Sequence, residues 1–95
     1  EEPIKILALL AGHFRLLAQV KWLAQAGYGQ TQIASALKVH PFRVKLALGQ
    51  AARFSEQELA KAIDELAAAD YEVKSGAMDR RLAVELLLMR WGGRQ

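Results

Sequence analysis

The sequence has few of the side chains that perform catalysis or bind metals. Its two histidines, His13 and His40, lie far apart in the chain, and it contains no cysteine. Zinc sites are built from closely spaced cysteine and histidine ligands, so two isolated histidines do not predict one. There is also no glycine-rich phosphate loop, HExxH motif or GxSxG motif. We therefore expect no catalytic residue, metal ligand or cofactor, and no enzyme in this chain by itself.

Asp70 and His13 are the polar residues that fall within apolar helical stripes. A buried carboxylate needs a partner, and Lys74 lies one helical turn after Asp70, while Arg80 or Arg81 can reach back to it. A general acid would need a second polar group converging on it, and none is evident. We predict that Asp70 forms a structural ion pair and that His13 is a hydrogen-bonded core or interface residue.

Helices must position these residues, because no stretch alternates polar and apolar residues with a period of two. Residues 4–25 are strongly apolar and contain no acidic residue, so we expect this helix to be buried against several neighbours. Further helices are predicted at residues 30–37, 41–52, 56–74 and 80–91. The predicted fold is all-α, a single five-helix bundle that forms one helical domain over residues 1–95.

Local capping signals predict where these helices begin and end. Ser55 and Glu58 have the spacing of a capping box. His40 and Asp79 each precede a predicted helix and can cap it, and Gly27 and Gly76 suit the left-handed position after a helix. The last helix is apolar on several sides: one stripe is formed by Leu82, Leu86 and Met89, and other apolar residues lie elsewhere around it. Such a helix is either central or docks onto another chain.

Residues 30–51 have the apolar pattern of a helix-turn-helix, although Lys38 stands where glycine is usual in the turn. The outward positions of the second helix are predicted to be Phe42, Arg43, Lys45, Leu46 and Gly49. Base readout by such a helix uses Arg, Lys, Asn or Gln, whereas phenylalanine and leucine suit a protein surface better. A DNA-binding module remains the alternative to a protein-binding one.

Charge and composition limit the possible partners. Residues 3–55 contain seven basic residues and no acidic one, so this half favours nucleic acid or an acidic protein surface, or is a solvated face without a partner. The apolar runs are expected to be too short to span a membrane. The lack of cysteine fits the cytoplasm. A chain that begins at Glu1 without methionine is expected to be a fragment of a longer protein.

Four segments, in this order and spacing, resemble the C-terminal domain of the delta subunit of bacterial DNA polymerase III. They are LALLAGHFRLLAQVKWL at 7–23, IASALKVHPFRVKLALGQAARFS at 33–55, LAAADYEVKSG at 66–76 and LAVELLLMRW at 82–91. The resemblance implies the collar, or oligomerisation, domain of a sliding-clamp loader, a DNA-replication complex of the bacterial cytoplasm. It implies a non-catalytic accessory subunit, because delta is similar to an ATPase without being a working one, and the family's two ATPase-like N-terminal domains are absent from this chain.

The resemblance also implies the partners. The collar would join delta to the delta prime and tau/gamma subunits in a pentameric ring that loads the clamp, and the full complex would contact primer-template DNA. The clamp itself would be bound by the absent N-terminal domain, so no clamp-binding residue is expected here. We predict collar contacts at seven residues, of which Arg43 and Lys45 form a polar rim: Phe42, Arg43, Lys45, Leu46, Leu87, Leu88 and Trp91.

Overall fold

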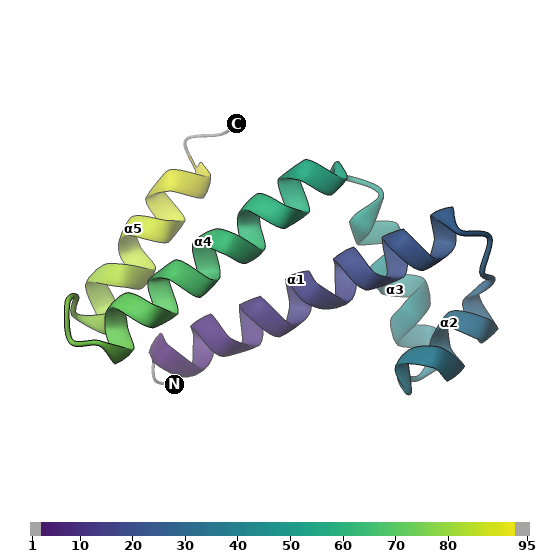
Figure 1. Cartoon of the computed structure of the whole chain (residues 1–95), viewed down its shortest axis with the longest axis horizontal. Helices are drawn as coiled ribbons and strands as arrows, with labels where there is room; N and C mark the ends of the chain where they lie inside the picture. The colour runs from purple at the N-terminus through teal and green to yellow at the C-terminus, as the bar shows by residue number, and fades with distance from the viewer. Residues whose placement is uncertain (1–2, 93–95) are drawn as a thin grey trace. The chain divides into compact units, whose positions relative to one another are not determined.

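The computed structural model describes residues 3–92, and residues 1–2 and 93–95 of the predicted domain lie outside the described part. Five helices follow one another along it: α1 Pro3–Gln25, α2 Gln30–Leu37, α3 Pro41–Ala51, α4 Glu56–Lys74 and α5 Arg80–Gly92 (Figure 1). No strand occurs within residues 3–92. The predicted all-α class is confirmed, and the predicted helix boundaries agree closely with the observed ones.

The predicted caps are present at most helix ends. Ser55 Oγ accepts a hydrogen bond from the Glu58 amide at 3.0 Å, and Glu58 Oε1 accepts one from the Ser55 amide at 2.8 Å. Asp79 Oδ2 accepts from the amides of the second and third residues after it, at 3.0 and 3.2 Å. Gly27 and Gly76 have φ values of +98° and +81° after α1 and α4. These local bonds satisfy backbone groups that a helix end leaves unpaired.

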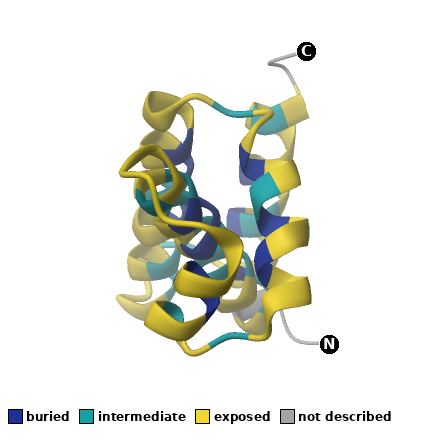
Figure 2. Cartoon of the chain, turned by 90° about the vertical axis from the view of Figure 1, so that its right-hand side faces the viewer, coloured by how far each residue is buried: buried dark blue, intermediate teal, exposed yellow. Residues whose placement is uncertain are grey.

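By contact density the chain forms two compact units, and α1 and α4 contribute to both. We call Phe14–Ala60 the central unit, and the remainder, up to His13 and from Lys61 onward, the terminal unit. Within each unit the buried residues lie on the inward sides of the helices (Figure 2).

In the central unit, four helices supply one apolar core. Its buried residues are Leu16, Leu17, Val20, Ile33, Ala34, Val44, Ala47, Ala51 and Leu59. The rings of Phe14 and Phe54 meet edge to face beside this core, with centroids 5.8 Å apart. Helices α2 and α3 pack directly on each other, and Lys38 between them has the left-handed values φ 59° and ψ 44°. The tight turn expected between these helices is therefore observed.

In the terminal unit, the buried residues of α4 and α5 are mostly small. They are Ala62, Leu66 and Ala69 of α4 and Ala83 and Leu87 of α5, and α1 contributes Leu7. Alanines at these positions allow helix axes to approach closely. The core here contains fewer large side chains than the core of the central unit.

By length and composition alone, Lys5–Gln25 of α1 is apolar enough to cross a membrane. The individual apolar runs within it are short, as expected, because His13, Arg15 and Lys21 interrupt them, although the helix as a whole meets this criterion. The core helix of a globular protein meets the same criterion, and α1 places Leu7, Leu16, Leu17 and Val20 in apolar cores. We interpret α1 as a core helix.

Candidate partner-binding surfaces

The side of α3 that faces away from the core carries two large apolar residues. Phe42 is 58% exposed and Leu46 is 51% exposed, one helical turn apart. Arg43, Lys45 and Gly49 are exposed around them. We call these five residues the α3 outer face. The opposite side of the helix is buried through Val44, Ala47 and Ala51. The outward positions predicted from the sequence are confirmed, whereas their partner remains a prediction.

Both ends of α3 are tied to other parts of the central unit. At the first turn, His40 Nδ1 accepts a hydrogen bond from the Phe42 amide at 3.0 Å, and Gln30 Nε2 donates to the Pro41 carbonyl at 3.0 Å. At the last turn, Lys21 Nζ donates to the Ala51 carbonyl at 3.3 Å. A surface on a helix held in this way is preorganised, which lowers the entropic cost of binding.

Gly49 has no evident structural role within the chain. A Cβ atom added there would have no heavy atom within 4 Å, apart from its sequence neighbours and the backbone of its own helix. Glycine in a helix interior costs about 1 kcal/mol relative to alanine. The fold would therefore accept alanine, and the reason for glycine must be sought outside the described contacts.

The α3 outer face lies in a basic part of the molecule. The central unit contains six basic residues and two acidic ones, a net charge of +4, and both acidic residues lie in the first turn of α4. Arg43 and Lys45 lie on either side of Phe42 and Leu46 around the helix. The face is thus an apolar centre with a positive rim.

Helix α5 carries a second exposed apolar set. Leu82, Leu86, Leu88 and Met89 are 45%, 39%, 54% and 71% exposed, and we call them the α5 outer residues. Of these four residues, only Leu88 was predicted from the sequence to be a contact. The spacing of Leu82, Leu86 and Met89, at i, i+4 and i+7, was a signal that could have identified them.

Two predicted contacts on α5 differ from expectation. Leu87 is only 3% exposed and lies in the core of the terminal unit beside Ala83, so its prediction as a surface contact was wrong. Helix α5 has apolar residues on most of its sides, so periodicity did not show which of them face inward. Trp91 is half-buried and is engaged with α4, whereas Leu88 is exposed as expected.

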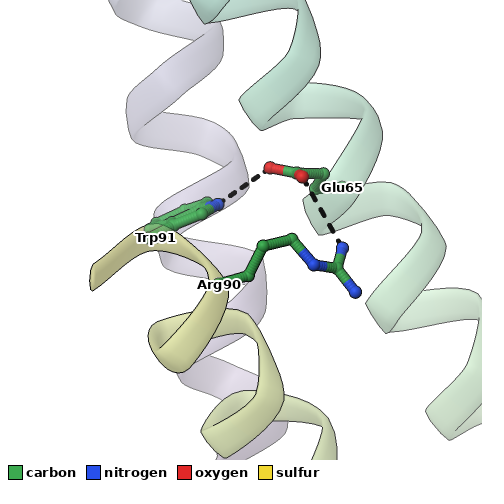
Figure 3. Close-up of polar contacts among 3 residues, drawn as sticks. All are labelled: Glu65, Arg90 and Trp91. Atoms are coloured by element: carbon green, nitrogen blue, oxygen red, sulfur yellow. Dashed lines mark hydrogen bonds and ion pairs between the residues drawn. The ribbon is translucent and has the colours of Figure 1, made fainter. Parts of the chain in front are cut away.

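Glu65 of α4 joins two residues of α5 (Figure 3). Its Oε1 accepts a hydrogen bond from Trp91 Nε1 at 2.9 Å, and its Oε2 lies 3.6 Å from a guanidinium nitrogen of Arg90. The Glu65 side chain is 11% exposed, so the interaction is largely shielded from water. Glu65 was not predicted as a functional residue, although its spacing of three and four residues from Ala62 and Ala69 places it on the packed side of α4.

The other polar candidates have structural positions. Asp70 Oδ2 lies 2.9 Å from Lys74 Nζ, which confirms the predicted pair, but the two side chains are 31% and 64% exposed. A pair this exposed adds little stability. His13 is half-buried in α1, and His40 is the cap of α3. In the described residues, no group of three or more histidine, cysteine, aspartate or glutamate side chains could hold a metal ion.

Comparison with known proteins gives one consistent result. The family model for the C-terminal domain of the DNA polymerase III delta subunit matches residues 1–91. DNA polymerase III subunit delta of Bacillus subtilis is 59% identical over 90 residues, which are 95% of this chain and 26% of that protein. The solved structure of the Bacillus subtilis DNA clamp loader delta protein (YqeN) superposes with a TM-score of 0.91, also at 59% identity. The chain spans about a quarter of the length of these relatives.

Proposed function

Because the chain belongs to the family of C-terminal domains of the DNA polymerase III delta subunit, we propose that it is a subunit-assembly domain of a bacterial clamp loader. In this role it holds delta in a pentameric ring with the delta prime and tau/gamma subunits, so that their ATP cycle acts on the sliding clamp. The observation that supports this role most directly is the family match over residues 1–91.

The two exposed apolar sets fit such a role. The α3 outer face belongs to the central unit and the α5 outer residues belong to the terminal unit, so each unit carries a candidate contact surface. A subunit inside a ring meets two neighbours through different surfaces. We propose that each surface contacts one neighbour, in the bacterial cytoplasm where replication takes place. The sliding clamp and primer-template DNA would be reached within the complete loader.

DNA binding by α3 is the alternative function, favoured by the basic central unit. The chemistry of the α3 outer face argues against DNA binding. Two of its exposed side chains, Phe42 and Leu46, have no hydrogen-bonding group with which to read base edges. Such residues are typical of the centre of a protein interface. We therefore favour a protein partner for this face.

Native mass measurement tests the assembly role. The protein would be measured alone and then mixed with delta prime and with the tau/gamma subunit, at high salt and without DNA. We expect a stable hetero-complex, because apolar contacts resist screening by salt, whereas phosphate contacts weaken steeply with it. A protein that stays free beside every subunit, and instead binds duplex DNA in a salt-sensitive manner, would contradict the assembly role.

A further inference from the structure

Resting on the assembly role proposed above, we infer that the α3 outer face binds an amphipathic helix of a neighbouring clamp-loader subunit. The apolar residues of that helix meet Phe42 and Leu46, its flanks carry acidic residues, and its backbone approaches closely at Gly49. Three independent features of the face support this inference: its apolar spacing, its charge and its glycine.

The apolar spacing matches a helical partner. Phe42 and Leu46 are one helical turn apart and both are more than half exposed, so they form a short ridge along α3. Ridges of this kind pack into the groove between side chains of a facing helix. Amphipathic helices that bind such surfaces present apolar anchors with the same i, i+4 spacing.

The charge around the ridge determines the type of helix that fits. Arg43 and Lys45 flank Phe42 and Leu46, and residues 3–55 contain no acidic side chain. A helix with basic flanks would be repelled, whereas glutamate or aspartate on its flanks would pair with this rim. Opposite charge at a rim mainly accelerates association, and the apolar centre then sets the dissociation rate.

Gly49 explains how the partner would pack. It lies one turn beyond Lys45 and Leu46 on the same exposed side of α3, and no atom of the described chain occupies the space of its missing Cβ. Glycine lets another backbone approach where any side chain would prevent it. A helix interior loses stability through glycine, so close contact with a neighbour accounts for a residue that the fold itself does not require.

Three variants test the inference, each measured for binding to delta prime, to the tau/gamma subunit and to a labelled primer-template DNA. Phe42→Ala removes the apolar anchor, and Arg43→Glu with Lys45→Glu reverses the rim. Gly49→Ala fills the space for close approach. The charge control is Lys5→Glu with Lys61→Glu, which changes the net charge as much as the rim variant does, at exposed sites in the terminal unit. The second control is Ser35→Ala on the exposed side of α2.

We expect Phe42→Ala to weaken binding to one of the two subunits about 30-fold, as for an interface hot spot. The rim variant should slow association about ten-fold at low salt, and the charge control should not. Gly49→Ala should raise the Tm by about 4 °C through helix propensity and yet weaken binding. Misfolding would lower both stability and affinity, so it cannot cause a higher Tm together with weaker binding.

The outcomes separate this inference from the assembly role. If the unmodified protein binds one subunit but all three variants bind it equally well, another surface makes the contact and the inference is wrong, while the assembly role stands. If the unmodified protein binds neither subunit, the assembly role itself fails and the inference falls with it. If the rim variant loses only primer-template binding, the α3 outer face is a DNA site and the inference is overturned.

Discussion

Lys38 is the only non-glycine residue with a positive φ in the part of the chain that the structure describes. Its backbone is left-handed at φ 59° and ψ 44°, where a Cβ atom lies too close to the backbone and costs roughly 1–2 kcal/mol. The conformation lets the Lys38 amide bond to the Ala34 carbonyl and end α2 before α3 begins. Glycine is usual at this position of a helix-turn-helix turn for the same reason, because it has no Cβ atom to lie too close to the backbone.

Lys38→Gly is therefore expected to stabilise the protein. We predict a rise of about 0.5–1 kcal/mol in the free energy of unfolding, because the relief of left-handed strain exceeds the extra freedom that glycine gives the unfolded chain. Urea unfolding followed by circular dichroism measures this change. Lys38→Ala removes the same charge but keeps the Cβ atom, so equal stabilisation by both substitutions would show that charge, not strain, is responsible.

Trp91 and Trp22 offer a matched comparison on the same chain. Trp91→Phe removes the indole N–H that donates to the largely buried Glu65, so we expect the free energy of unfolding to fall by about 1–2 kcal/mol. Trp22 is 66% exposed, and Trp22→Phe should change stability by less than about 0.5 kcal/mol. Similar losses in the two variants, measured by urea unfolding, would mean that the hydrogen bond to Glu65 contributes little.

At the scale of helices, the start of α4 and the buried side of α5 are determined in different ways. The start of α4 is fixed by its own sequence through reciprocal bonds between Ser55 and Glu58. The buried side of α5 is set only by packing against its neighbours. Helix α5 carries apolar residues on most of its sides, and only Ala83 and Leu87 are buried. Helix ends are thus local properties, whereas the choice of buried side depends on packing.

Ser55→Ala tests the local contribution at the start of α4. Loss of the hydroxyl acceptor for the Glu58 amide should lower the free energy of unfolding by about 1 kcal/mol. Ser35→Ala, at an exposed position inside α2, is the control and should be neutral or slightly stabilising, because alanine is the better helix former. Thermal unfolding of both variants gives the difference, and no loss in Ser55→Ala would rule out the capping box as a stabilising element.

At the scale of the whole molecule, a buried and an exposed leucine lie next to each other on α5. Leu87 is 3% exposed and Leu88 is 54% exposed. A charge at position 87 would be buried in the apolar core of the terminal unit, whereas a charge at position 88 would remain in water. The pair therefore separates folding from assembly with one type of substitution.

We predict that Leu88→Glu keeps the helicity of the protein and weakens its hetero-complex with other clamp-loader subunits, whereas Leu87→Glu destabilises the fold by more than about 3 kcal/mol. Circular dichroism and native mass measure the two properties. A loss of helicity in Leu88→Glu would place this residue in the core. An intact complex with that variant would instead remove Leu88 from the contact surface.

The sequence alone was sufficient to predict the helices and their ends. Capping residues such as Ser55, Asp79 and His40 act on amides two or three positions away, so their effect can be read without knowledge of the fold. It also determined the outward side of α3, because the buried residues of that helix form one stripe and leave Phe42 and Leu46 opposite to it. The family resemblance was likewise present in the order of its segments and agrees with the family match.

Packing in three dimensions was needed to show which apolar residues of α5 are core and which are surface. Periodicity gives no answer for a helix that is apolar on most sides, so Leu87 and Leu88 were equivalent until α5 was packed against its neighbours. The bond between Glu65 and Trp91 joins residues far apart in sequence, and its partners are specified by packing alone. Local chemistry acts over a few residues, whereas burial and long-range pairing arise only when distant segments meet.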